Sequence, residues 1–241
     1  MPRRPTPARP PRPPRTPRHV PPRWRRQPEA RPAQILDAAL IEFGERGLAN
    51  ARLDDIAKRA GVAKGTIYLY FPTKDDLFRA MIRHITGSAI GDFEVQMAAH
   101  AGAHAADRIR HYVESMWEHL RSPNFAVLYR LTIGELPDFP DLMRFYIRET
   151  AERTLKICAG ILRDGVARGE FRPLDPESTA RMVHAIVIKH AVWCAHRPQV
   201  PFVAGASDRQ IVRDMNAFIQ HALAPASAPT PARPERARRR K

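Results

Sequence analysis

The sequence predicts an all-α fold. Between residues 32 and 223, apolar side chains recur at intervals of three and four residues, which is the spacing of one helix face. No run of β-branched residues with alternating polarity indicates a strand. An apolar content of 44% in 241 residues is enough to build a core, so a wholly disordered chain is excluded.

Proline, glycine and capping residues set the ends of nine expected helices. The first helix begins at Pro32, which suits the first helical position, and stops at Gly47. Pro72 ends the third helix, and Thr73 and Asp76 form a capping box that starts the fourth. The expected helices span about 32–46, 53–60, 63–70, 75–97, 106–121, a short stretch after 123, 141–168, 176–195 and 208–223.

The net charge of +15 suggests a polyanionic partner, but this charge is concentrated at the two ends of the chain. Residues 1–31 carry +9 and residues 224–241 carry +5, which leaves +1 for residues 32–223. Both ends are rich in Pro and Arg and poor in apolar residues, so we expect a disordered arm and a disordered basic tail. Either they add salt-sensitive affinity for phosphates, or the N-terminal arm is an accident of composition.

Targeting signals and membrane spans are not indicated. The chain does not begin with an apolar stretch of signal-peptide type, and its most apolar region, 185–195, is too short for a membrane span. Cys158 and Cys194 lie in apolar helical stretches without a CxxC pattern, which predicts reduced, buried thiols. We therefore expect a soluble, cytoplasmic protein without a membrane partner.

Motifs for catalysis and metal binding are also missing from the sequence. The stretch 87–91 lacks the G-x-S-x-G spacing, and there is neither an HExxH motif nor a glycine-rich phosphate loop after a strand. His100 and His104 are four residues apart, as are His190 and Cys194, but neither pair has a convincing third ligand. We expect no enzyme activity, no metal and no cofactor.

The region 53–71 has the outline of a helix-turn-helix. Apolar residues from Leu53 to Ala60 form one stripe, and Gly61 ends that helix in a tight turn. In the next helix, Ala63, Ile67 and Phe71 are expected to face the core, because they follow a rotation of about 100° per residue.

The opposite face of the second helix is suited to DNA. It offers hydroxyl groups and a lysine to base edges or phosphates, and a glycine that permits close approach. The residues expected to face DNA are Lys64, Gly65, Thr66, Tyr68, Leu69 and Tyr70. Lys74 and the free N–H groups of the following helix form a phosphate site beside them. For Lys58 and Arg59 we expect solvated surface charges.

The segment from Leu53 to Phe78, LDDIAKRAGVAKGTIYLYFPTKDDLF, resembles the DNA-binding domain of the TetR/AcrR family of bacterial transcriptional regulators. The resemblance extends upstream through residues 35–47, ILDAALIEFGERG, and so covers about a fifth of the chain in detail. The remaining helices are similar to the family in number and order only.

This resemblance implies roles for several residues on and near the recognition helix. Thr66 would approach bases, and Tyr68, Tyr70 and Lys74 would hold phosphates. Arg52 departs from the family, which often has a capping Ser or Thr at this position. Arg52 can still reach a phosphate, and Asn50 is expected to cap the helix in its place.

Two domains are expected between the arm and the tail. Residues 32–81 form a three-helix DNA-binding domain, and residues 82–223 form a larger helical domain that, by the resemblance, binds an effector and dimerises. Residues 84–223 hold 16 basic and 16 acidic side chains, so this part is not a nucleic-acid surface. The helix from Asp75 is shared by both domains and can transmit motion between them.

The resemblance further implies an effector cavity between the middle helices and a dimer interface on the last two long helices. An aromatic residue at helical spacing belongs to the core more often than to a pocket. The candidates for the cavity are Trp117, Phe125, Tyr129, Phe145 and Trp193. The apolar stripes expected at the dimer interface are Val183, Ile186, Val187, His190 and Cys194 on one helix and Ile211, Met215, Phe218 and Ile219 on the other.

These observations predict a homodimeric transcriptional regulator, most simply a repressor that binds a near-palindromic operator and responds to a small molecule. A two-fold dimer suits such DNA, because recognition helices about 34–36 Å apart reach successive major grooves. The alternative is an architectural protein that senses no ligand and is held to DNA by its basic ends.

Overall fold

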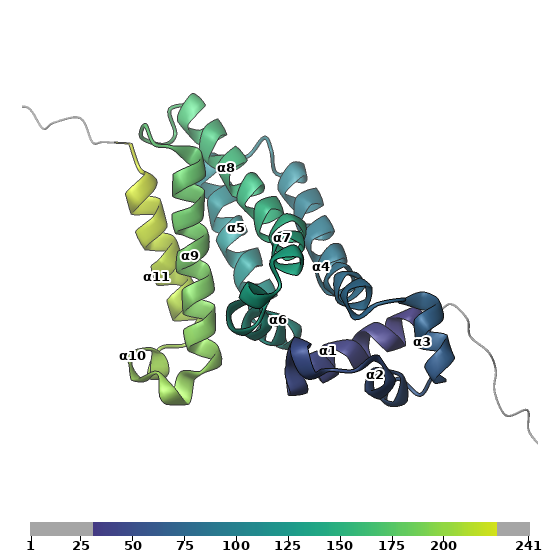
Figure 1. Ribbon diagram of the computed structural model, residues 1–241. Helices are drawn as coiled ribbons and strands as arrows, with labels where there is room; N and C mark the ends of the chain where they lie inside the picture. Colours follow the sequence, from purple (N-terminus) through teal and green to yellow (C-terminus); the bar gives the residue numbers. More distant parts are fainter. Residues whose placement is uncertain (1–30, 226–241) are drawn as a thin grey trace, which may run out of the picture.

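The computed structural model describes residues 31–225, and this part of the chain consists of helices and connecting segments without a strand (Figure 1). The all-α prediction is therefore confirmed. The helices are α1 (Arg31–Asn50), α2 (Leu53–Arg59), α3 (Lys64–Tyr70), α4 (Lys74–Ala99), α5 (Ala105–Leu120), α6 (Pro123–Gly134), η1 (Leu136–Asp138), α7 (Pro140–Glu149), α8 (Ala151–Ala167), α9 (Pro176–Ala195), η2 (Arg197–Gln199), α10 (Pro201–Ala204) and α11 (Asp208–Leu223). The expected arm, 1–31, and tail, 224–241, lie outside the described residues except for their inner ends.

Side-chain caps begin four of the helices, as the sequence pattern favours. The Thr73 hydroxyl accepts a hydrogen bond from the Asp76 N–H at 3.1 Å, so the predicted start of α4 is confirmed. Ser122, Asp175 and Ser207 cap α6, α9 and α11 in the same way. These polar caps satisfy N–H groups that have no partner within the helix.

The described residues contain eleven α-helices instead of the nine expected, because one expected helix is divided and one helix is additional. The expected helix 141–168 is divided at Thr150, which has φ −123° and ψ −77°. The Thr150 hydroxyl donates to the Tyr146 carbonyl at 2.7 Å, and a hydroxyl bonded one turn back tends to bend a helix. The second difference is the short helix α10, where no helix was expected.

The end of α1 agrees with the expected stop at Gly47. This glycine has φ +80°, a left-handed conformation that favours glycine, and the helix resumes for one turn to Asn50 in a new direction. The N–H groups of this last turn therefore need acceptors outside the helix.

Apolar side chains gather in two clusters. The larger one is built from α5, α8, α9 and α11, which pack side by side (Figure 1). The other surrounds α1 to α3 and the first half of α4, and it also takes in Leu128, Leu131, Leu136, Leu142 and Phe145 from α6, η1 and α7. The helices on which the recognition helix rests thus share a core with α6 and α7.

Helix α4 contributes to both clusters, which agrees with the expectation that one helix is shared. Phe78 and Met81 belong to the cluster around α1, whereas Phe93 and Met97 belong to the larger cluster. The boundary at residue 81 stays a prediction, since residues beyond it from α6 and α7 join the first cluster.

A small polar group lies inside the larger cluster. The Tyr112 hydroxyl is 3.2 Å from Nδ1 of His184, and both Tyr112 and Cys158 are fully buried. Burial raises the pKa of the Cys158 thiol to about 12 and lowers the pKa of His184 to about 4. The thiol is therefore protonated and His184 neutral at pH 7. Cys194 is buried as well, so both cysteines are buried as predicted.

No helix among residues 31–225 is long and apolar enough to cross a membrane. Within the same residues, no group of three His, Cys, Asp or Glu side chains has the geometry to hold a metal ion.

We predict that stability falls on acidification because His184 must become charged. Between pH 6.5, the ordinary pKa of histidine, and about 4, the unfolded chain binds a proton that the folded chain does not. The free energy of unfolding should decrease over this range by up to about 3 kcal/mol. Urea unfolding of His184→Gln between pH 4.5 and 7.5 should show a shallower pH dependence than the wild type.

The matched control is His221→Gln, which changes an exposed histidine on α11. It should keep the wild-type slope. His119 supplies part of the remaining slope, since burial lowers its pKa too. An unaltered slope in His184→Gln would show that His184 is not the titrating group.

Candidate nucleic-acid interface

Helices α2 and α3 form the expected helix-turn-helix. Gly61 has φ +67°, and the Val62 N–H donates to the Ala57 carbonyl at 3.0 Å to close the turn. Ile56 and Ile67 are fully buried, one from each helix. The turn and these two side chains hold α3 against α2, on the core that α1 and α4 share.

An ion pair holds α2 on α1. The Arg59 Nε donates to Oε2 of Glu42 at 3.0 Å, and the Glu42 carboxylate is almost entirely buried. Arg59 also bonds to Glu45. Lys58 and Arg59 are both exposed, as expected of surface charges, but the Arg59 guanidinium also neutralises a buried carboxylate.

The outward face of α3 matches the predicted DNA-facing surface only in part. Leu69 is 79% exposed and Tyr68 is 42% exposed, and Lys64 and Gly65 are exposed as well. Because the Leu69 side chain is so exposed, it contributes nothing to the core.

Other residues of α3 lie differently from their expected places. Thr66 and Tyr70 are half-buried, and Tyr70 packs against the core around α1. Ala63 is exposed, so its expected position facing the core was wrong. It lies at the cap, before the helix geometry begins, and the rotation of 100° per residue does not apply to it.

A carboxylate that the sequence analysis did not single out touches this face. The Lys64 Nζ lies 2.7 Å from Oδ2 of Asp54, and the Tyr68 hydroxyl lies 3.4 Å from Oδ1. The hydrogen bond from Lys64 holds the pKa of Asp54 below its usual value, and the same bond raises the pKa of Lys64. Lys64 and Tyr68, which are both expected to contact DNA, thus contact the same carboxylate, that of Asp54 on α2.

Lys74 closes the loop between α1 and α2. Its ammonium donates to the carbonyls of Ala49 at 2.9 Å and Ala51 at 3.3 Å, which leaves one N–H for another acceptor. Arg52 precedes α2, is exposed, and makes no side-chain cap, as expected of arginine. The Asn50 amide donates to the Arg46 carbonyl, so the expected cap by Asn50 was wrong.

The five candidates for the effector cavity do not come together. Trp117, Phe125 and Tyr129 belong to the larger cluster or pack against it. Phe145 lies in the other cluster, below the guanidinium of Arg83, whose Cζ is 4.9 Å from the ring centre. The fifth candidate, on α9, faces an open groove.

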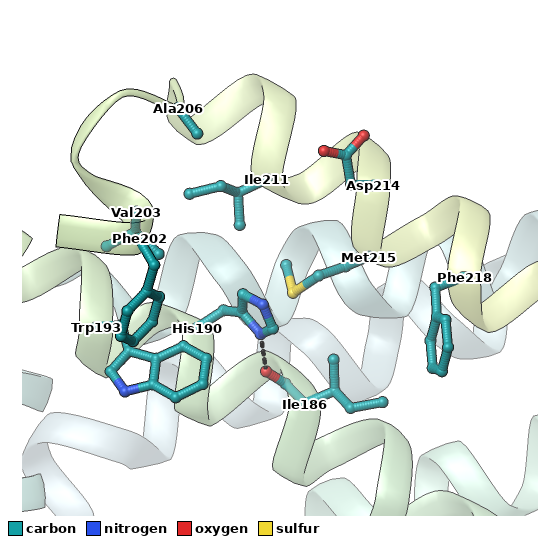
Figure 2. A pocket seen from close by; sticks show the side chains of 10 residues that line it. All are labelled: Ile186, His190, Trp193, Phe202, Val203, Ala206, Ile211, Asp214, Met215 and Phe218. Carbon is teal, nitrogen blue, oxygen red and sulfur yellow. Dashed lines mark hydrogen bonds between the residues drawn. The ribbon is translucent and has the colours of Figure 1, made fainter. Parts of the chain in front are cut away.

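That groove has a volume of about 470 Å³ and runs between α9, α10 and α11 (Figure 2). The ring of Trp193 meets Phe202 edge to face at 4.9 Å, and Phe218 lies farther along the groove. Phe202 and Phe218 are 70% and 63% exposed. This open apolar surface has no partner among the described residues.

Most residues of the expected dimer stripes face the interior of their own chain. The buried members are Val183, Val187, Cys194, Ile211, Met215 and Ile219. Ile186 and His190 are half-buried, and Phe218 is exposed. Val183, Val187, Cys194 and Ile219 thus pack within their own chain, and the expected interface stays a prediction. The other five members of the stripes line the groove: Ile186, His190, Ile211, Met215 and Phe218.

Family models match this chain at both ends of the described part. The model of tetR-family bacterial regulatory proteins matches residues 35–81, and the model of the AefR-like transcriptional repressor C-terminal domain matches residues 107–222. The fatty acid metabolism regulator protein of Bacillus subtilis is 31% identical over 158 residues, which are 64% of this chain and 78% of that protein. The chain belongs to the TetR family.

Other relatives and solved structures agree with this membership. The transcriptional repressor KstR2 of Mycolicibacterium smegmatis is 26% identical, over 74% of this chain and 85% of that protein. A regulator from Saccharomonospora viridis, solved with choline, has a TM-score of 0.64 and 26% identity, covering 82% of this chain and 99% of the other. FadR from Bacillus subtilis, solved with stearoyl-CoA, has the same fold, with a TM-score of 0.62, 24% identity and coverages of 79% and 97%.

As a TetR-family member, the chain is a DNA-binding transcriptional regulator, and the relatives named here are regulators rather than enzymes. The first match includes α2 and α3, where the sequence motif was recognised. The second includes most of α5 to α11, where the sequence resembles the family only in the number and order of its helices.

We predict that Gly65→Ala separates folding from DNA binding. A Cβ at Gly65 meets no atom within 4 Å, so alanine should stabilise α3 by about 0.5–1 kcal/mol. The same methyl group would lie on the face predicted to meet DNA and should weaken duplex binding about tenfold, the cost of a lost close contact. Thermal unfolding and fluorescence anisotropy with labelled duplex would measure both effects.

Gly160→Ala is the matched control, since a Cβ there also meets no atom within 4 Å and the residue lies on α8. It should gain stability without a change in DNA affinity. If Gly65→Ala bound duplex as tightly as the wild type, α3 would not approach DNA through this face.

Proposed function

We propose that the chain is a homodimeric repressor that binds a near-palindromic operator and releases it when a small molecule binds. The observation that carries this proposal is the outward face of α3. Lys64, Gly65, Tyr68 and Leu69 are exposed there and add nothing to the core. A short helix with these side chains suits a major groove, because it offers an ammonium group, a hydroxyl group and an apolar side chain, and its glycine permits close approach.

Individual roles follow from the chemistry and the position of each residue. Thr66 and Leu69 would meet base edges, Leu69 through the methyl group of thymine. The hydroxyl groups of Tyr68 and Tyr70 would donate hydrogen bonds to phosphates, and Lys74 would donate its remaining N–H to a phosphate as well. Arg52, exposed at the start of α2, would reach the backbone of the same strand.

The proposed dimer interface is the groove between α9, α10 and α11, which is lined by five residues of the stripes predicted from sequence. Phe202 and Phe218 are large, open and adjacent to the half-buried Trp193, and a second copy would cover them. Pairing through these helices would bring two copies of α3 to one side of the dimer, as a two-fold operator requires.

The proposed effector site is near α4, α5 and α6. A groove of about 360 Å³ there is lined by Phe93, Met116 and His119, among others, and Phe125 packs on His119 with ring centres 6.0 Å apart. Because one relative regulates fatty acid metabolism, a long-chain acyl compound is the first ligand class to test. A regulator of this kind would act in the cytoplasm, where bacterial DNA lies.

The effector signal would reach the recognition helix through α6 and α1 as well as through α4. The Glu135 carboxylate, at the end of α6, accepts the Leu48 N–H at 2.5 Å, beyond the bend at Gly47. Arg130 donates to the Gly44 carbonyl, and a Cβ at Gly44 would lie only 3.0 Å from Val127. A shift of α6 would therefore move α1.

The alternative function is an architectural protein held to DNA by its ends, 1–31 and 224–241. It would bind duplexes with little sequence preference and a steep dependence on salt. The exposed face of α3 favours the repressor, because a protein that bound DNA through its basic ends alone would not need a helix that presents side chains to base edges.

The experiment that tests the function is selection of bound duplexes from a random pool at about 150 mM salt, where non-specific phosphate binding is already weakened. The full chain and a shortened chain of residues 32–223 should yield the same near-palindromic motif. The absence of a motif from both chains would instead support the architectural alternative.

Phe218→Glu tests the dimer within the same selection. A charge in the middle of the proposed interface should leave a monomer in analytical ultracentrifugation and reduce the selected motif to a half-site. A dimer with the full motif would place the interface elsewhere.

We predict that Glu135→Ala uncouples α6 from α1. The Leu48 N–H loses its acceptor, so its amide hydrogen exchange should become at least about tenfold faster, as expected when a hydrogen bond to a charged group, worth about 1.5–3 kcal/mol, is lost. Exchange measured by NMR should leave amides of α9 unchanged. Glu177→Ala, which breaks an exposed ion pair with Arg163, is the control and should not alter Leu48. Equal rates in both variants would contradict the coupling.

A further inference from the structure

Asp54 is an acid within the surface that the proposed function assigns to DNA. It lies in the first turn of α2 with an exposed side chain, and its two carboxylate oxygens bind two partners on α3. Oδ2 accepts from Lys64 at 2.7 Å, and Oδ1 accepts from the Tyr68 hydroxyl at 3.4 Å. A DNA phosphate would be bound in the same way, with a lysine and a hydroxyl group that donate to its anionic oxygens.

We propose that Asp54 occupies the place of a phosphate on the free recognition helix and must be displaced by DNA. It is a specificity-determining residue that lowers the affinity of α3 for duplexes that offer Lys64 no better partner. This inference rests on the proposed role of α3 in DNA binding.

Asp54 affects DNA binding because its charge cancels that of Lys64. Lys64 paired with Asp54 is a neutral pair, so it attracts no phosphate and its binding releases no counterion from DNA. The pair is exposed and therefore weak, so a well-placed phosphate can open it. In a chain of net charge +15, such a neutral pair limits binding to bulk DNA through α3.

The neighbouring acid, Asp55, does not share this position. Its carboxylate lies 3.6 Å from Arg46 of α1, and in the described part of the chain no hydrogen bond or ion pair joins it to α3. Asp54 and Asp55 stand in the same helical turn and make similar interactions with the helix dipole. Asp54→Asn and Asp55→Asn therefore change the net charge equally and differ in whether they free Lys64.

The test is binding of both variants in the full chain to a random-sequence duplex, which requires no known operator. Asp54→Asn should tighten binding about fivefold at 150 mM salt and steepen the slope of log K against log salt by about 0.9, the value for one more phosphate contact. Asp55→Asn should change affinity less than twofold and leave the slope unaltered.

Lys64→Met supplies the decisive background. There the excess effect of Asp54→Asn over Asp55→Asn should vanish, because the freed cation is gone. If Asp54→Asn and Asp55→Asn acted alike in the wild-type background, or if the excess persisted with Lys64→Met, the inference would be wrong. Failure of the wild-type chain to bind any duplex would instead overturn the proposed function, so the two failures are distinguishable.

Circular dichroism of each variant checks the fold. A loss of helix in Asp54→Asn alone would assign the pair to holding α3 in place and would overturn the inference.

Discussion

Burial of Ile67 and Phe71 is the interaction on which the DNA-binding surface depends. Helix α3 has seven residues, and a helix of this length is not stable alone in water. These two side chains, 0% and 8% exposed, hold it on the core formed by α1 and α4. Because so few positions are used for anchoring, most of the remaining surface of α3 is free to contact DNA.

The same core explains how a distant helix can affect α3. Leu131 and Leu136, from α6 and η1, pack in the cluster that contains Ile67. Close packing transmits displacement, since protein interiors leave little free volume. Helix α3 therefore shares one packed core with α6 and η1, and the division predicted at residue 81 follows the chain order rather than the packing.

The sequence predicted the helix-turn-helix well because its signals are local. Gly61 needs a left-handed turn, Pro72 stops a helix, and the Thr73 cap acts within four residues. The division at Thr150 was missed because threonine is not a strong helix breaker, and its effect depends on where α7 and α8 pack.

Predictions that needed tertiary contacts were less accurate. The stripe on α9 that contains Val187 looked like an interface, but a helix that is apolar on several sides can place any of them inward. The five aromatic candidates were chosen by residue type and do not line one cavity: Phe125 and Tyr129 pack together, but Phe145 belongs to the other cluster. Asp54 was overlooked because its partners, Lys64 and Tyr68, are 10 and 14 residues away, and one-dimensional spacing within a helix says nothing about contacts between helices.

The contact between α6 and α1 is matched in size to the task proposed for it. An effector can weaken DNA binding only by the difference in its affinity for the two arrangements, typically about 1–3 kcal/mol. A hydrogen bond from a backbone N–H to a carboxylate contributes about the same amount, and Glu135 accepts one from Leu48 and a longer one from Ala49 at 3.4 Å. A contact much stronger than this would hold α1 in one place whatever the ligand did. A few directed hydrogen bonds beside Gly47 can be broken by an effector and can still report a small movement of α6.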